Sequence, residues 1–131
     1  KDAVGDFEFS KKQLELLKDK VDIYSGNDNQ TYDFVINGGV GVVSVASHVV
    51  GDEISEMISF AKDNDLEKAE EINMQLSNLF EAIFEEPSPG PIKKILSESW
   101  EEVGEPLLPI TSITPELANK IRGFYKKIKE N

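Results

Sequence analysis

The sequence predicts an α/β fold at its N-terminal end, followed by a purely helical region. Strand and helix patterns alternate through the first part, which is typical of a parallel sheet whose strands are joined through helices. From Leu66 onward, apolar residues recur at helical spacing and no further strand pattern appears. A chain of 131 residues, of which 39% are hydrophobic, can bury a core of ordinary size.

The first predicted elements are a short helix and a short strand. Ser10 and Gln13 have the spacing of a capping box, which predicts a helix from there to about Lys18. Residues 21–24 favour a β-strand. The run Ser-Gly-Asn-Asp at 25–28 stops that strand and predicts a loop of the kind that can bring backbone N–H groups to a small anion, or an ordinary turn.

A second helix and a second strand come next. Tyr32, Val35 and Ile36 form one apolar helical face, and the glycines at 38 and 39 predict a helix end at positive φ. Residues 41–50 are apolar on both alternating faces and rich in valine, so they predict a strand buried on both sides of a parallel sheet. The apolar stripe of the following helix comprises Ile54, Met57, Ile58 and Ala61.

Three further helices are predicted in the second half. A long first helix ends at the proline-rich break 86–91, Pro91 opens the second, and Thr114 followed by Pro115 predicts the N-terminus of the third. Their apolar stripes are Ala69, Ile72, Leu76, Leu79, Phe80 and Ile83, then Ile92, Ile95 and Leu96, then Leu117, Ile121, Phe124, Tyr125 and Ile128.

The predicted sheet is incomplete as it stands. Two parallel strands cannot close a barrel, and their outer edges would have no partners. We therefore expect the remaining strands to lie outside this sequence. Lys1, which stands where an intact reading frame would begin with methionine, points the same way.

Composition argues against several classes of partner. The chain has 25 acidic and 14 basic residues, and its formal charge of -11 repels phosphate backbones and anionic headgroups, so neither nucleic acid nor a membrane is expected as a partner. The absence of cysteine removes disulfides, thiolate zinc sites and cysteine nucleophiles, and it fits a cytoplasmic protein. No metal or other cofactor is expected.

Lys1 is the first candidate for chemistry. A lysine amine becomes a nucleophile when it is neutral, and burial at a strand end or nearby cations lower its pKa. The alternative is a solvated lysine. His48 is the single histidine, and because it has no partner at a recognisable spacing, a structural role at the end of the predicted strand is the better interpretation.

Other polar and aromatic residues have plainer interpretations. Tyr24 and Trp100 are expected to pack rather than to react. The glutamate pairs 70–71 and 85–86 lie on predicted helices beside lysines, which indicates solvated faces rather than a metal site. The glycines at 38–41 precede a strand, which is the wrong order for a dinucleotide-binding loop.

Several segments together resemble a known family. These are Lys1-Asp2-Ala3 with Gly5-Asp6, YSGND at 24–28, GGVGVVSVASHVVGDEI at 38–54, EEPSPGPIK at 85–93 and LLPITSITPE at 107–116. In order and spacing they are similar to the C-terminal part of the dihydrodipicolinate synthase family. The resemblance implies the C-terminal portion of a (β/α)8 TIM barrel, about strands seven and eight with their flanking helices, in residues 1–64. A three-helix C-terminal subdomain is implied in residues 65–131.

The resemblance also implies roles for individual residues. Lys1 matches the lysine that forms a Schiff base with pyruvate, at the end of strand six. Gly26 matches a glycine whose close backbone approach shapes the pyruvate pocket, in a motif that usually reads Ser-Gly-Asp-Asp and here has Asn27. Val43 matches a branched apolar residue beside bound pyruvate. Ser88 replaces the asparagine of the usual Glu-Pro-Asn-Pro, which bears on a structural turn.

The implied activity is a lyase reaction that condenses pyruvate with aspartate semialdehyde in lysine and diaminopimelate biosynthesis, usually in homotetramers. The family's proton-relay tyrosine, paired threonines and substrate-binding arginine have no counterparts in this sequence. Two alternatives stay open. An N-acetylneuraminate lyase or a 2-keto-3-deoxy sugar acid aldolase shares the lysine and the barrel, and a non-catalytic barrel fragment would need a complementary chain.

Overall fold

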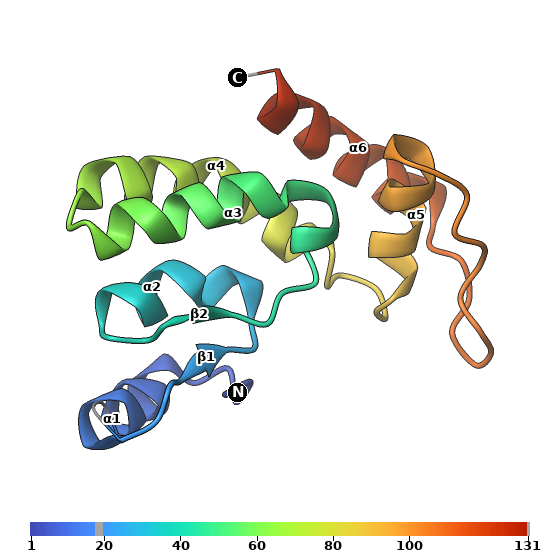
Figure 1. Ribbon diagram of the computed structural model, residues 1–131. Helices are drawn as coiled ribbons and strands as arrows, with labels where there is room; N and C mark the ends of the chain where they lie inside the picture. The colour runs from blue at the N-terminus through green and yellow to red at the C-terminus, as the bar shows by residue number, and fades with distance from the viewer. Residues whose placement is uncertain (18–19, 131) are drawn as a thin grey trace.

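The computed structural model describes residues 1–17 and 20–130, which form a small parallel sheet and a set of packed helices (Figure 1). Helix α1 lies on one side of the strands, and α2 and α3 lie on the other. Helices α3 and α4 run side by side, and α5 and α6 continue the helical layer. The elements in chain order are α1 (Phe7–Leu17), β1 (Tyr24–Ser25), the 3-10 turn η1 (Asp28–Gln30), α2 (Thr31–Ile36), β2 (Gly41–Val42), α3 (Ser47–Lys62), α4 (Leu66–Ala82), α5 (Gly90–Ser99) and α6 (Pro115–Lys129).

The sheet is parallel and has a third segment beside its two strands. Tyr24 pairs with Gly41 and Ser25 with Val42. On the other side of β1, Asp2 forms an isolated parallel bridge with Ser25. Each segment is followed by a helix, so the chain repeats the β-then-α unit of a parallel α/β fold.

The predicted strand 41–50 was wrong beyond Val42. Residues 43–46 form a loop, and α3 begins at Ser47. The N–H groups of Val45 and Ala46 donate to the Asp28 carboxylate at 3.1 and 3.3 Å, so neither is available to a neighbouring strand. Val50 lies inside α3 but has non-helical angles (φ -131, ψ 38), where the helix is kinked.

Helix α1 begins before the predicted capping box. It starts at Phe7, and the Asp6 carboxylate accepts the Phe9 N–H at 3.2 Å, which is the N-capping interaction. Ser10 therefore lies inside the helix rather than at its cap. The predicted end at Lys18 lies outside the described residues.

The predicted apolar face of helix α2 is confirmed at Tyr32 and Val35 but is wrong at Ile36. Phe34 and Val35 are buried, whereas Ile36 is exposed. The predicted glycine end is confirmed, because Gly38 has φ +98 and the Gly39 N–H donates to the Phe34 carbonyl at 2.8 Å.

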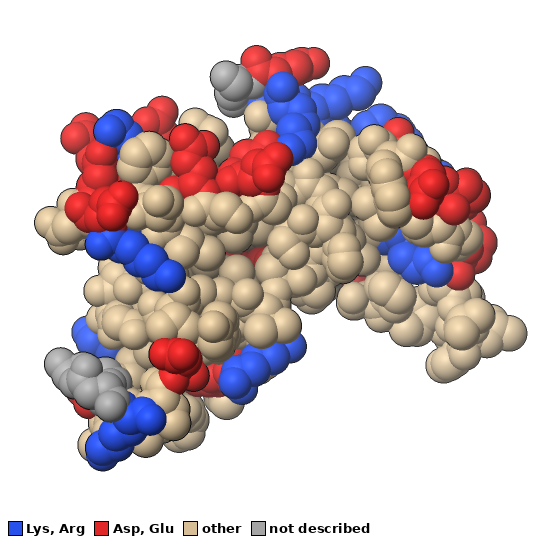
Figure 2. Space-filling view, viewed as in Figure 1, with Lys and Arg blue, Asp and Glu red and all other residues tan. Residues whose placement is uncertain are grey.

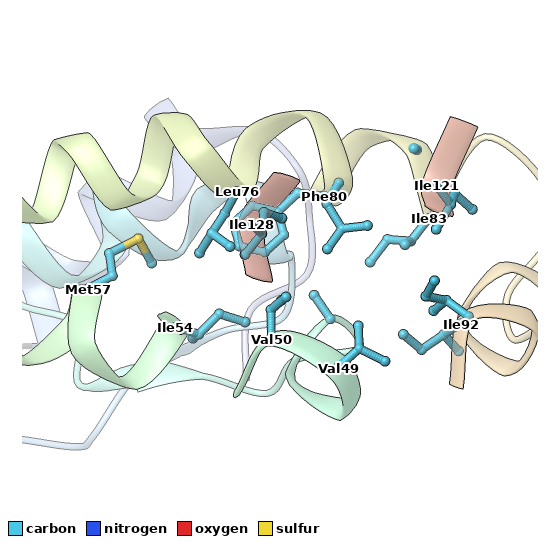
Figure 3. Close-up of a cluster of buried hydrophobic side chains, with 14 of the residues drawn as sticks. Val49, Val50, Ile54, Met57, Leu76, Phe80, Ile83, Ile92, Ile121 and Ile128 are labelled. Carbon is cyan, nitrogen blue, oxygen red and sulfur yellow. The ribbon is translucent and has the colours of Figure 1, made fainter. Parts of the chain in front are cut away.

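One apolar core joins the two halves of the chain (Figure 3). Side chains from α3 and α4 face one another along its length, α5 lies at one end, and α6 packs along the core from that end, near Ile121, to its middle, at Ile128. The residues labelled in the figure are Val49, Val50, Ile54, Met57, Leu76, Phe80, Ile83, Ile92, Ile121 and Ile128, all of them buried.

Helices α4 and α6 of the second half begin at residues with recognisable capping side chains. Asp65 caps α4, its carboxylate accepting the Lys68 N–H at 3.5 Å. As predicted, Thr114 caps α6 with Pro115 at the first helical position, and the Thr114 hydroxyl accepts the Leu117 N–H at 3.4 Å. Trp100 departs from the prediction, because it is 68% exposed. It follows the last residue of α5 with non-helical angles, φ -132 and ψ -87, so it is not part of the apolar helical stripe.

The visible face in Figure 2 shows acidic side chains gathered over α3 and α4 and basic ones next to them at the end of α6, where Lys129 pairs with Glu53 of α3. Within residues 1–17 and 20–130, no helix has the length and apolarity needed to cross a bilayer.

The core predicts a sharp contrast between two neighbouring residues of α4. Leu76 is fully buried, whereas Met74 is 61% exposed. We expect Leu76→Ala to lower the free energy of unfolding by about 2–5 kcal/mol, because it leaves a cavity. Met74→Ala should change it by less than about 0.5 kcal/mol. Denaturant unfolding followed by circular dichroism measures both, and equal effects would contradict the assignment of the core.

Candidate functional site

Lys1 lies against Gly26 at the edge of the sheet. A Cβ atom added to Gly26 would lie 2.6 Å from Lys1 Cε, 2.6 Å from Ala3 Cβ and 2.9 Å from the Asp2 carbonyl oxygen. Real Cβ atoms do not approach other atoms so closely, so only glycine leaves room for the lysine side chain at this position. The Gly26 main chain therefore lies close to the side chains of both Lys1 and Ala3.

Main-chain hydrogen bonds fix this contact. The Gly26 N–H donates to the Asp2 carbonyl at 2.6 Å, and the Asp2 N–H donates to the Tyr24 carbonyl at 2.9 Å. Together they hold the residue after Lys1 in parallel register with β1. The Lys1 side chain is exposed at this sheet edge.

Val43 follows β2 at the same end of the sheet. Its N–H donates to the Ser25 carbonyl at 2.8 Å, and its side chain is 50% exposed. Because the paired residues Asp2, Ser25 and Val42 stand at one level, Gly26 and Val43 each come directly after it. Lys1 comes before that level, but its side chain extends to Gly26, so the lysine stem reaches the end of β1 that Gly26 and Val43 adjoin.

A buried carboxylate ties the loops after β1 and β2 together. Asp28 is 1% exposed, and its Oδ1 accepts a hydrogen bond from the Ser44 hydroxyl. Its Oδ2 accepts the N–H groups of Val45 and Ala46. Sequence analysis did not single out this bridge, although an aspartate three residues after a strand was the available signal.

The first N–H groups of the loop at 25–28 are already hydrogen-bonded within the protein. The Gly26 N–H is bound to Asp2, and the Asn27 N–H donates to the Ser25 hydroxyl at 3.1 Å. The Ser25 hydroxyl in turn donates to the Asn27 carbonyl at 2.8 Å. These bonds describe a tight turn that shapes the sheet end, rather than one whose first N–H groups are free to meet an anion.

Of the other predicted candidates, His48 lies on α3, whereas Tyr24 lies in the strand beside the segment of Lys1, where its carbonyl accepts the Asp2 N–H. His48 is exposed in the first turn of α3 rather than at the end of a buried strand, and it lines a hollow of about 390 Å³ with Trp100 and Tyr125. Its placement follows from the early end of β2 at Val42. Tyr24 is part of β1 and is 40% exposed.

The glutamate pairs are surface groups. Glu70 and Glu71 are exposed on α4, while Glu85 pairs with Lys120. Both Glu86 carboxylate oxygens accept the Thr114 N–H, at 3.2 and 3.3 Å. In the part of the chain that the structure describes, no group of three or more His, Asp or Glu side chains is arranged to hold a metal ion.

The most strongly shifted ionisable group lies between α5 and α6. The Arg122 guanidinium donates to both carboxylate oxygens of Glu98 at 2.8 Å, and Lys94 stands 3.2 Å away. These cations lower the pKa of Glu98 to about 2. On α2, burial raises the pKa values of Tyr32 and Asp33. All of these groups belong to the helical layer and not to the sheet end that carries Lys1.

Comparison with known proteins decides the family. The sequence profile of the Dihydrodipicolinate synthetase family matches residues 1–128. The chain belongs to this family. Among curated relatives, the 4-hydroxy-tetrahydrodipicolinate synthase of Microcystis aeruginosa is 44% identical over 128 residues, which is 98% of this chain and 43% of that protein. The corresponding synthase of Listeria monocytogenes is 32% identical over 130 residues, 99% of this chain and 44% of that protein.

Solved structures of the family have the same fold. The dihydrodipicolinate synthase of Thermotoga maritima superposes with a TM-score of 0.94 at 28% identity, over 98% of this chain and 45% of that one. The synthase of Cyanidioschyzon merolae, solved with lysine bound, gives a TM-score of 0.91 at 35% identity over 98% and 44%. The chain thus spans less than half the length of the relatives it matches, and its sheet and helices are those of a C-terminal partial barrel.

The close contact at Gly26 predicts that a larger residue there destabilises the protein. We expect Gly26→Ala to displace Lys1 or Ala3 and to lower the free energy of unfolding by about 1–3 kcal/mol, because the added Cβ overlaps both side chains. Gly123→Ala in α6 is the control, since a Cβ there meets no atom within 4 Å and alanine favours a helix. Urea unfolding measures both, and a neutral Gly26→Ala would contradict the close approach.

Asp28 generates a second prediction at the site. We expect Asp28→Ala to lower the free energy of unfolding by at least about 2 kcal/mol, because two N–H groups and a hydroxyl lose a buried charged acceptor. The exposed Asp22→Ala, just before β1, should stay within about 0.5 kcal/mol of the unsubstituted protein. If hydrogen exchange at Val45 and Ala46 is equally slow in both variants, the proposed bridge is wrong.

Proposed function

We propose that this chain carries the Schiff-base lysine and part of the pyruvate pocket of a lyase that condenses pyruvate with aspartate semialdehyde. The observation that carries the proposal is the contact of the Lys1 side chain with Gly26 at the ends of adjacent parallel segments. Catalytic groups of barrel enzymes stand at the carboxyl ends of the strands. Family membership and relatives named 4-hydroxy-tetrahydrodipicolinate synthase support the same reaction.

The chemistry requires a neutral amine near a carbonyl. The lone pair of Lys1 Nζ attacks C2 of pyruvate, and loss of water from the carbinolamine gives an iminium ion. Loss of a proton from C3 gives an enamine, whose C3 attacks the aldehyde carbon and forms the new C–C bond. Water then attacks C2 and releases the amine, or the product's own amino group does so as the ring closes.

Gly26 and Val43 have supporting roles in this proposal. Gly26 lets the lysine side chain pack against the main chain, which restricts the positions that the amine can reach. The half-exposed Val43 offers an apolar surface beside which the pyruvate methyl group can rest. Neither role needs a cofactor.

The remaining parts of the site belong, in this proposal, to strands outside the chain. Relatives are more than twice as long, and proton transfer to and from the carbinolamine needs groups that this segment does not carry. We place the boundary between the barrel part, residues 1–64, and the helical subdomain, residues 65–131, at the turn before α4, where Asn64 has φ 61. A homotetramer is the assembly we expect.

The test is chemical trapping of the imine. The intact protein is reduced with borohydride in the presence of pyruvate, digested, and analysed by mass spectrometry that separates the ε-amine of Lys1 from any α-amine. We expect one pyruvate adduct on Lys1 Nζ and none on Lys11 or Lys12, which lie on α1 away from the sheet end. Lys1→Arg should abolish the adduct.

The absence of any adduct on Lys1 would contradict the proposal, and two other results would do so as well. One is equal labelling of Lys1, Lys11 and Lys12, which would mark Lys1 as an ordinary surface amine. The other is a trapped imine with pyruvate but no turnover of aspartate semialdehyde when N-acetylmannosamine or a sugar-derived aldehyde is accepted instead. That outcome would keep the imine and assign the chain to a sugar acid aldolase.

A further inference from the structure

Asp2, the residue after Lys1, has a buried side chain that the proposed reaction does not use. The residue is 7% exposed. Its Oδ2 accepts the Ser10 hydroxyl of α1 at 2.7 Å, and its Oδ1 accepts the Val4 N–H at 2.9 Å. Both carboxylate oxygens therefore have donors from inside the protein, which is how a buried charge is accommodated.

The same residue is bound to the sheet through its main chain. Its N–H and carbonyl pair with Tyr24 and Gly26 across the edge of β1. Asp2 thus links three parts of the fold: the turn that follows it, the first helix, and the strand whose end carries Gly26. In the described chain the bridge to Ser25 is the single ladder contact of this segment, so its alignment depends on few bonds.

Neighbouring residues of an extended segment point to opposite faces. Lys1 reaches towards Gly26, while the Asp2 carboxylate reaches towards Ser10 and α1. The carboxylate is thus directed at the helix rather than at the substrate, and its influence on the amine passes through the backbone.

We propose that Asp2 is the positioning residue of the reactive lysine: by fastening the segment after Lys1 to α1, it holds the lysine side chain against Gly26. This inference rests on the proposed function, because it concerns the same amine. Without the carboxylate, residues 1–4 would lose the Ser10 and Val4 contacts that set their direction, and the main-chain bonds to β1 that remain would open more often. A lysine side chain with more conformational freedom places its amine within reach of the pyruvate C2 atom less often. This lowers the rate of imine formation without altering how pyruvate is bound.

Two readouts on the intact protein test this: hydrogen exchange of the Gly26 N–H, which reports the bond to Asp2, and the borohydride-trapping rate of Lys1 at varied pyruvate concentration. We expect Asp2→Ala to accelerate Gly26 exchange and to lower the maximal trapping rate about tenfold. The pyruvate concentration for half-maximal trapping should change less than about twofold, because recognition is untouched. Ser10→Ala should give a smaller effect in the same direction.

Two further variants separate positioning from charge and from simple loss of stability. Asp2→Asn keeps an acceptor for Val4, and its amide can donate to the Ser10 oxygen, so it should recover trapping to within about threefold of the unsubstituted protein. Leu76→Ala, which destabilises the remote core, should trap pyruvate normally below its unfolding transition.

The outcomes are distinct. If Asp2→Ala traps pyruvate as fast as the unsubstituted protein, or if Asp2→Asn is as slow as Asp2→Ala, positioning through these hydrogen bonds is refuted. If the unsubstituted protein forms no adduct at Lys1, the proposed function fails. The exchange rate of Gly26 in Asp2→Ala and Ser10→Ala then still decides whether Asp2 fixes the strand end: unchanged exchange in both overturns it.

Discussion

The main chain around Ser25 is the constraint on which the candidate site depends. Ser25 is fully buried between Asp2 on one side and Val42 on the other, and parallel pairing sets all three at one level. The residues beyond that level, Gly26 and Val43, are therefore placed side by side, and Lys1 is held within reach of Gly26. Because parallel strands end at the same edge of a sheet, residues far apart in sequence meet there without any direct bond between their side chains.

Two aspartate side chains stabilise this edge of the sheet through hydrogen bonds. The Asp28 carboxylate binds the loop after β2, and the Asp2 carboxylate binds Ser10 of α1. Both are buried, and both bind donors within the protein. A buried carboxylate costs free energy unless its oxygens accept hydrogen bonds, so each aspartate requires its donors to stay at defined positions. The helical layer supports the sheet in a different way, through an apolar core that runs from α3 to α6.

The sequence predicted the elements better than their limits. Helical spacing and proline placement located the three helices of the second half, and the Thr114-Pro115 start of α6 agrees in detail. Two of the errors came where a side chain from elsewhere in the chain binds the segment. Ser10 has the spacing of a helix cap, but its hydroxyl donates to the Asp2 carboxylate. Valines 49 and 50 have strand propensity but lie in α3, because the Asp28 carboxylate accepts the backbone N–H of Ala46 just before them. Local propensity does not register a competitor that comes from elsewhere in the chain.

The sequence alone determined the α/β-then-helical order, because hydrophobic spacing is a local property of the chain. The candidates Lys1, Gly26 and Val43 came from the resemblance of short motifs to the family that the comparisons then showed. Only the tertiary structure decided that Lys1 touches Gly26, that Asp2 and Asp28 brace the sheet end, and that Trp100 faces solvent. Those facts follow from parallel register and from the path of each loop, which arise when segments distant in sequence pack together. No spacing within a single segment encodes them.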